Sequence, residues 1–528
     1  MALALVCLGF VFFFFGISIY GRWLEKLFGV DPSRPTPAVS SSDGVDKVPA
    51  PWPILFGHHF ASIAGAAPII GPVLAISLWG WVPVYWWVVL GSVFVGGLHD
   101  FGALMMSLRY GGMSIAGISK EVLSDRAKVF FSIFLYLALV LVVAVFSAVT
   151  AKTFIEGPEI VLPSFGLIGV AVFLGYLFNN RGWKIVPGTV LGLFLLALLI
   201  ALGGKMPLTI TGEHALPIWI TILLIYAFVA SITPVQYLLQ PRDYLSSYLL
   251  FFGLILGYAG LLVSRPSINF PQHSMDSPLE FWPMLFVVVA CGALSGFHSL
   301  IASGTTARQI ANESHGRKVA YAAMVAEGAL ALLSTMAIIA GYSSPERFLA
   351  TLKEVGPIGA FSQGFGVITT PVLGKWGSVF AVIMLNSFVF TTLDTATRVG
   401  RYVVEDLTGI KNRQMSSLFV VVPALILAIS GQWKSVWPLF GAANQLIASM
   451  VLLMIWLFLM NNNKRSGVVL LMGGAMYITI MAALCKKLVQ VFPNNLLLST
   501  IAVILLILAV YMIFEVGKKG LLGKKGGR

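Results

Sequence analysis

The chain has 528 residues, of which 58% are hydrophobic and only 10% are charged. Soluble domains carry about 25% charged residues, so this composition excludes a soluble globular protein and indicates a polytopic membrane protein. The net charge is +13, but the basic residues lie in short clusters between apolar runs, as they do in cytoplasmic loops. We therefore expect membrane lipids, and no nucleic acid, beside these clusters.

Apolar runs long enough to cross a bilayer follow one another along the whole chain. We predict an all-α fold with about fifteen transmembrane helices of roughly 20 residues. The predicted spans are 1–20, 57–79, 82–106, 128–150, 163–179, 185–204, 217–238, 245–264, 281–305, 319–342, 376–397, 416–431, 436–460, 467–485 and 496–515. The segment 355–373 is not counted, because glycine and proline interrupt it, and a re-entrant loop is the alternative for it.

The first run lacks a basic start and a small-residue cleavage site, so we expect a retained span and not a signal peptide. Cys7, Cys291 and Cys485 share no metal-ligand spacing and are interpreted as core residues without a disulfide framework. The longest polar linkers are 21–56 and 265–280.

Basic residues are concentrated in every second loop of this span order, which is the distribution expected of cytoplasmic loops. These residues are Arg22, Lys26, Arg109, Lys120, Arg126, Lys128, Arg181, Lys184, Arg242, Arg308, Arg317, Lys318, Arg398, Arg401, Lys411, Arg413, Lys464 and Arg465, followed by the tail 518–528. The pattern predicts an outside N-terminus and a cytoplasmic C-terminus in the cell membrane. Lys486 and Lys487 are the exception.

Two spans carry the same interruption. The stretches 57–72 and 296–309 both contain Gly-x-His-x5-Gly, and the first also contains Pro68 and Pro72. Glycine and proline weaken a helix, and a membrane tolerates irregular backbone only inside protein or around a cavity. By the span order the two stretches cross in opposite directions, which indicates the binding site of a secondary transporter. A kinked, tightly packed helix is the structural alternative.

Ionisable side chains inside a membrane are costly and are functional candidates by default. Five places stand out: His58 with His59, His99 with Asp100, the stretch 295–309, Glu327 and the stretch 391–398. Glu327 has no ionisable neighbour in sequence, so it needs a partner or a proton.

Each place has a structural alternative. The histidines could be interfacial or core residues, and His99 with Asp100 could be a helix-end pair. Asp394 is expected to pair with Arg398 one turn later on the same helix. The residues Gln236, Gln240, Arg242 and Asp243 are interpreted as ordinary capping at the cytoplasmic end of a span.

Other classes of function find less support. Four histidines with Asp100 and Glu327 could form a transition-metal site, but their spacing matches no closed ligand motif, so we expect no metal and no cofactor. We expect no enzyme either, because no nucleophile motif is present. A Walker loop is also absent, which argues against ATP-driven transport. A channel fits paired, broken helices less well than alternating access does.

Several long stretches resemble the carbon starvation protein A family. They are 56–72, 240–245, 295–309, 390–398 and 437–445, and the resemblance runs from about residue 50 to 450. It implies an inner-membrane secondary transporter that takes up peptides during nutrient limitation, with pyruvate–proton symport in some members. The chain resembles a short form of the family, which ends soon after two further spans.

The resemblance also implies a core of two inverted five-helix repeats, as in transporters of the APC/LeuT type. We place these repeats at 57–204 and 281–460. The remaining parts are an N-terminal span and linker at 1–56, an inserted span pair with an outer loop at 205–280, and C-terminal spans with a basic tail at 461–528.

We expect import of short peptides, coupled to protons or alternatively sodium, around the two broken helices. The expected substrate-binding residues are His58, His59, Gly65, Ala66, His298, Ser303, Gly304, Thr305 and Asn444. The expected proton-coupling residues are Glu327, Asp100, His99 and Asp394, with Glu327 favoured for its depth. A pyruvate–proton symporter, and a metal-binding membrane sensor or enzyme, remain the alternatives.

Overall fold

The computed structural model describes residues 1–274, 277–493 and 495–523, with the side chains of all these residues except 433–439, 497 and 522–523. The predicted motif residues 437–439 therefore lie outside the residues whose side chains are described. Within the described chain, twelve helices are long and apolar enough to cross a membrane, or thirteen if the bent pair Trp52–Ile63 and Ala67–Trp79 forms one span. The all-α, multi-pass membrane class is confirmed.

The helices follow one another with short connections. They are α1 (Ala2–Phe15), α2 (Gly21–Phe28), α3 (Pro37–Ser40), α4 (Trp52–Ile63), α5 (Ala67–Trp79), α6 (Trp81–Leu90), α7 (Gly97–Arg109), α8 (Ile115–Val122), α9 (Asp125–Glu156), α10 (Val161–Asn180), α11 (Ile185–Lys205), α12 (Ala215–Ile232), α13 (Leu239–Ser264), α14 (Phe281–Val288), α15 (Gly296–Gly304), α16 (Ala322–Gly341), α17 (Pro345–Leu373), α18 (Gly377–Thr408), α19 (Arg413–Ile429), α20 (Trp433–Asn461), α21 (Gly467–Val491) and α22 (Leu496–Gly523).

The expected number of spans is too high by this measure for two reasons. The predicted span 281–305 is divided into α14 and α15, and 416–431 corresponds to α19, which is too short to qualify. The segment 355–373 is helical as part of α17 and bends at Gly356, whose φ of +72° is left-handed. The segment is not counted among the predicted spans, yet here it is part of the helical candidate span Pro345–Thr408.

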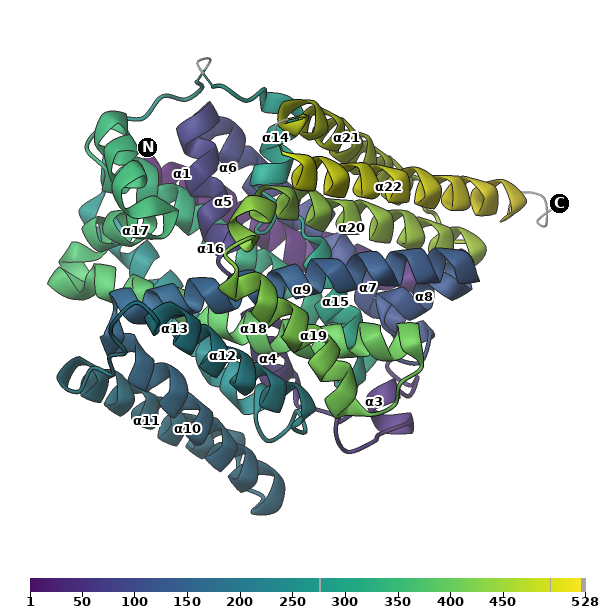
Figure 1. Cartoon of the computed structure of the whole chain (residues 1–528), viewed down its shortest axis with the longest axis horizontal. Coiled ribbons are helices and arrows are strands. Elements are labelled where there is room, and N and C mark those ends of the chain that lie inside the picture. Colours follow the sequence, from purple (N-terminus) through teal and green to yellow (C-terminus); the bar gives the residue numbers. More distant parts are fainter. Residues whose placement is uncertain (275–276, 494, 524–528) are drawn as a thin grey trace.

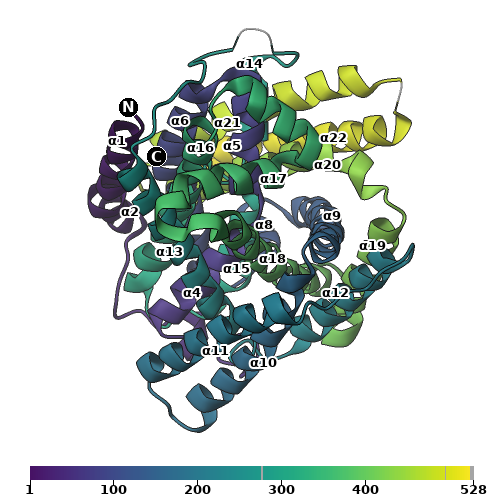
Figure 2. The ribbon, with the colours of Figure 1, turned by 90° about the vertical axis from the view of Figure 1, so that its left-hand side faces the viewer.

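The long helix α9 runs through the middle of the molecule and packs along α18 (Figure 1). The broken helix α4 packs on α13 and also touches α15, α16 and α18. Both views place the α10–α11 hairpin at one edge of the bundle and the α21–α22 hairpin at the opposite edge (Figure 2). The two broken helices thus lie in the packed interior between these hairpins.

The first expected break is present, and the second lies just before the expected stretch 296–309, whose first nine residues form helix α15. Helix α4 ends at Ile63, and α5 restarts after a bend of 41° with Pro68 in its first turn, where proline is tolerated. The second span is unwound over 289–295, where Gly292 has φ +88°. A side chain at Gly292 would lie 2.6 Å from Ala331 and 3.3 Å from Pro68, so the two breaks pack directly against each other.

Two amides on α20 satisfy the backbone that the second break exposes. Gln445 Nε2 donates to the carbonyls of Phe286 and Leu294, at 3.0 Å each. Asn444 Oδ1 accepts from the backbone N–H of Phe297 at 2.8 Å, in the first turn of α15. Because unpaired backbone groups are expensive in a membrane, these contacts stabilise the unwound segment as a fixed feature of the fold.

Two of the loops predicted to be cytoplasmic contact each other. The linker after α2 meets the loop after α15 where the backbone N–H of Asp31 donates to Glu313, which also pairs with Arg109. By contrast, Lys486 pairs with Glu280 of the 265–280 loop. The exception in the basic pattern thus lies with the loops predicted to be outside, and the orientation itself remains a prediction.

Candidate functional site

The centre of the site is an imidazole held between two carboxylates. His298 Nδ1 lies 2.9 Å from Asp100 Oδ2, and His298 Nε2 lies 3.1 Å from Glu327 Oε2. His99 Nδ1 lies 2.8 Å from the other oxygen of Asp100. All four side chains are completely buried, and they come from α7, α15 and α16. We call Asp100, His298 and Glu327 the central triad.

The protonation of the central triad follows from its geometry. A neutral imidazole has one N–H and can donate only once, yet both nitrogens of His298 face a carboxylate. Either His298 is an imidazolium, or one of the two carboxyl groups is protonated; Nε2 and Glu327 Oε2 lie within ion-pair distance but do not form a hydrogen bond. Without an added proton, two negative charges would lie unbalanced in the membrane interior, which is strongly unfavourable. These charges favour at least one additional proton in the central triad.

A second cluster lies around His58. Its Nδ1 is 2.6 Å from Asp243 Oδ2, and its Nε2 is 3.2 Å from the hydroxyl of Thr305. Gln309 reaches the same Nε2 at 3.4 Å and accepts from Gln240 at 2.7 Å. These contacts join α4, the first half of one broken span, to residues 305–309, which follow α15, the second half of the other.

The structure brings the remaining predicted site residues around the two breaks. His59 Nδ1 lies 2.7 Å from the hydroxyl of Thr306, and its Nε2 has no hydrogen-bond partner. Ala66 lies in the first break, and a side chain at Gly65 would lie 3.3 Å from Thr392. Gly304 packs in the same way against Val399.

The side chains of two predicted substrate-binding residues accept hydrogen bonds from backbone N–H groups. Ser303 accepts from the backbone N–H of Ile115 at 3.0 Å and thereby ties α15 to α8. Asn444 receives the N–H of Phe297, as described above. Both side chains are buried.

Three expectations about charged residues are wrong. Asp394 does not pair with Arg398 on its own helix; it pairs with Arg242 and accepts from the Tyr226 hydroxyl at 2.6 Å. Arg242 and its neighbour Asp243 are fully buried, so they do not simply cap a span end. His99 and Asp100 lie inside the continuous helical span Trp81–Arg109 and away from both of its ends, so the alternative of a helix-end pair does not hold.

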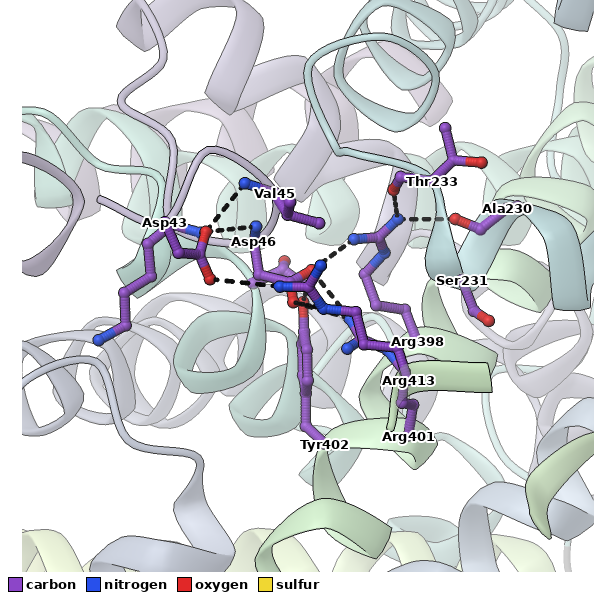
Figure 3. A network of polar contacts seen from close by, with 12 residues as sticks. Asp43, Val45, Asp46, Ala230, Ser231, Thr233, Arg398, Arg401, Tyr402 and Arg413 are labelled. Atoms are coloured by element: carbon purple, nitrogen blue, oxygen red, sulfur yellow. Dashed lines mark hydrogen bonds and ion pairs between the residues drawn. The ribbon is translucent and has the colours of Figure 1, made fainter. Parts of the chain in front are cut away.

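The true partner of Arg398 is Asp46, in the linker between α3 and α4. Asp46 Oδ1 accepts from Arg398 Nη1 at 2.6 Å and from the hydroxyl of Tyr402 at 2.8 Å (Figure 3). Arg401 Nη2 donates to both carboxylate oxygens, at 2.8 and 2.9 Å. Burial by itself would raise the pKa of Asp46, but Arg398 and Arg401 outweigh it and lower that pKa to about 2. We call these four residues the linker cluster.

One group of side chains has the composition of a metal site. Ligand atoms of Cys291, His298 and Glu327 lie within 4.8 Å of one another, and all three residues are buried. Imidazole, thiolate and carboxylate together suit zinc or another divalent transition metal. His298 and Glu327 also lie within ion-pair distance of each other, so their proximity does not require a metal ion. Metal analysis of the purified protein distinguishes an ion pair from a metal site.

The residues that were not predicted from sequence share one property. Each of them has a side-chain partner more than 150 residues away; these residues are Tyr226, Arg242, Asp243 and Asp46. The motif 240–245 is the sequence signal for Arg242 and Asp243, because it belongs to the family resemblance. No local pattern in the linker marks Asp46.

Comparison with known proteins places the chain in one family. A sequence model of the family described as "Carbon starvation protein CstA" matches residues 1–351 and 346–485. Peptide transporter CstA of Escherichia coli (strain K12) is 32% identical over 86% of this chain and 76% of its own length. Pyruvate/proton symporter BtsT of the same organism is 30% identical over 81% of this chain and 73% of its own length. Peptide transporter CstA of Bacillus subtilis (strain 168) is 32% identical, with 82% and 81% covered.

Solved structures show the fold. A mutant of the Eremococcus coleocola manganese transporter superposes with a TM-score of 0.54, covering 91% of this chain and 99% of that chain at 13% identity. Mhp1, a nucleobase-cation-symport-1 family transporter, gives a TM-score of 0.51 and covers 91% and 96% at 13% identity. These neighbours are LeuT-fold transporters, and at such low identity the likeness concerns the fold alone.

Proposed function

Because the chain belongs to the carbon starvation protein CstA family, a family of secondary transporters and not of enzymes, we propose that it imports short peptides together with protons. The proposed setting is the cytoplasmic membrane in nutrient limitation, with the N-terminus outside and the C-terminus in the cytoplasm. No cofactor is needed for this activity.

The observation that carries the proposal is the central triad. His298 lies on α15, directly after the unwound segment 289–295, and bridges Asp100 on α7 to Glu327 on α16. A proton held by the central triad therefore holds the broken helix to its neighbours. Loss of that proton leaves like charges facing each other and favours their separation. Proton release and movement of the broken helix are thereby linked.

Alternating access provides the transport cycle. The two breaks touch at Pro68 and Gly292, so a movement of one break displaces the other. Half-helix N-termini favour a substrate carboxylate, and freed carbonyls favour an ammonium group or a cation. A short peptide offers both groups. We keep His58, His59, Gly65 and His298 as the proposed lining, and 57–204 and 281–460 as the proposed repeats.

Pyruvate is the second candidate substrate, because a relative of nearly equal similarity is named a pyruvate/proton symporter. Pyruvate would use only the sites for a carboxylate. The same proton machinery would serve either substrate, so the central triad does not discriminate between them.

Uptake into proteoliposomes tests the proposal. Purified protein is reconstituted and offered dipeptides, tripeptides and pyruvate under an inward proton gradient, an inward sodium gradient, or neither. We expect peptide uptake that depends on the proton gradient and is abolished by a protonophore. Glu327→Gln should abolish this coupled uptake, while Glu346→Gln, at an exposed position in the first turn of α17, should leave it unchanged.

Three outcomes would overturn parts of the proposal. Uptake of pyruvate without peptide would replace the substrate, and dependence on sodium alone would replace the coupling ion. Coupled uptake that survives in Glu327→Gln would remove Glu327 from the mechanism.

A further inference from the structure

Arg242 is a buried arginine whose guanidinium is held at only one end. Its Nη1 pairs with Asp394 Oδ2 and donates to the Tyr226 hydroxyl at 2.9 Å. Its Nη2 has a single weak contact, at 3.3 Å, with the hydroxyl of Thr391, and its Nε has no hydrogen-bond partner. The side chain is 1% exposed, and the Phe390 ring covers the guanidinium at 4.5 Å.

The unheld edge is the one that recognises carboxylates. Nε–H and the nearer Nη–H of a guanidinium point in parallel and match the two oxygens of a carboxylate. Here that edge carries only the Thr391 contact, although burying such donors without partners is costly. The arrangement leaves two charge-assisted hydrogen bonds available to a ligand.

A small cavity lies beside Arg242. It measures about 20 Å³, and its lining includes Ser164, Ser387, Phe390 and Arg242 itself. The hydroxyl of Ser387 has no hydrogen-bond partner. A cavity of this size holds about one water molecule, so a larger ligand requires α10 or α18 to move, as alternating access would allow.

Two other buried arginines use both of their terminal nitrogens for hydrogen bonds. Arg401 uses Nη1 for Glu405 and Nη2 for both oxygens of Asp46. Arg398 uses Nη1 for Asp46 and Nη2 for two backbone carbonyls. Although both also leave Nε unbonded, neither has a lightly held Nη2 as Arg242 does.

Arg242 is also connected to the first broken helix. Thr391 contacts Arg242, and the next residue, Thr392, lies 3.4 Å from the carbonyl of Ser62 and beside Gly65. The residue after Arg242 is Asp243, which pairs with His58. A ligand bound at Arg242 would therefore be connected to α4 through two contacts, at His58 and at Ser62.

We propose that Nε and Nη2 of Arg242 bind the carboxylate of the transported substrate while Asp394 and Tyr226 hold the other end of the guanidinium. The ligand class is a small organic acid with a free carboxylate, such as a peptide C-terminus or a 2-oxo acid. This inference rests on the proposed function for its biological role, and the carboxylate subsite itself can be tested without transport.

The experiment compares acids with their uncharged counterparts on purified full-length protein. A dipeptide and its C-terminal amide, and pyruvate and its amide, are titrated against the wild type, Arg242→Lys and Arg401→Lys, with thermal stabilisation as the readout. We expect at least one acid to bind the wild type about tenfold or more tightly than its amide, because the amide removes the charge from both hydrogen bonds. Arg242→Lys keeps the charge but loses the parallel donors, so this preference should disappear, whereas Arg401→Lys should retain it.

Each result decides the inference. An unchanged acid preference in Arg242→Lys, or a wild type that shows no acid preference, overturns it. If Arg242→Lys does not fold, the double variant Arg242→Gln/Asp394→Asn, which removes both charges of the pair, is compared in the same way. Acid preference in binding without any uptake would refute the proposed function and leave the carboxylate subsite standing.

Discussion

The guanidinium of Arg398 donates to the carboxylate of Asp46 at 2.6 Å and so joins α18 to the linker before α4, 352 residues away in sequence. Arg401 and Tyr402 contact the same carboxylate, and Arg413 lies 3.8 Å from it (Figure 3). One acidic residue thus balances positive charge from two helices, α18 and α19. The linker is therefore a structural part of the bundle on the side predicted to be cytoplasmic.

The first prediction concerns the pH dependence of this contact. The pKa of Asp46 is lowered from 3.8 to about 2, so its ionised form stabilises the folded protein above about pH 4, and that stability is lost as the pH falls through the range from 4 to 2. At neutral pH this corresponds to about 2 kcal/mol. Asp46→Asn should therefore lower the melting temperature at pH 7, and its difference from the wild type should shrink below pH 4.

The matched control is Asp125→Asn, because the side chain of Asp125 is 82% exposed and pairs only with the exposed Lys120. Its melting temperature should follow the wild type at every pH. A difference between Asp46→Asn and the wild type that persists unchanged at pH 3 would contradict the assignment.

The second prediction concerns the amides that hold the unwound segment. Gln445→Ala removes the donor from the carbonyl of Phe286, in α14 before the break, and from that of Leu294, within the break. Leaving buried carbonyls unpaired costs about 1–3 kcal/mol each, so the variant should melt at a clearly lower temperature. Gln432→Ala, at an exposed position just before α20, should have no effect. Equal melting temperatures for both variants would show that the break does not need Gln445.

The third prediction concerns metal. If the groups around Cys291 serve as proton carriers, purified protein should contain less than about 0.1 equivalents of zinc, iron, copper or manganese per chain when analysed by mass spectrometry of the elements. A stoichiometric metal that is lost in Cys291→Ser and retained in Cys485→Ser, an exposed cysteine, would contradict the proton assignment. Such a result would also revive the alternative of a metal-binding membrane protein.

The sequence predicts the parts of this molecule that depend on local composition. Apolar runs predict the long helices, and the glycines and prolines of 57–72 predict the first break, whereas the second break lies at 289–295, just before the predicted stretch 296–309. The alternation of basic loops predicts an orientation that stays a prediction, and the exception Lys486 pairs with Glu280 of the 265–280 loop. These features depend on residues within one or two turns of each other, which a sequence displays directly.

The parts that could not be predicted depend on distant partners. Spacing along α18 favours a pair between Asp394 and Arg398, yet Arg242 and Asp46 take these residues instead. A partner at one-turn spacing is worth only about 0.2–0.5 kcal/mol, whereas a fully buried charge requires the best available partner, wherever it lies in sequence. The same reason explains why Arg242 was interpreted as a cap and why Glu327 was recognised without its partner His298.

The most direct test of the account measures protons and not substrate. Proteoliposomes containing a pH-sensitive dye receive the transported substrate on the outside, with no imposed proton or sodium gradient. Acidification of the lumen is recorded. The account predicts acidification with the wild type and none with Glu327→Gln, although Glu327→Gln should still exchange labelled for unlabelled substrate, since exchange needs no net proton movement. Acidification by Glu327→Gln at the wild-type rate would contradict the central claim that the buried Asp100–His298–Glu327 triad carries the coupled proton.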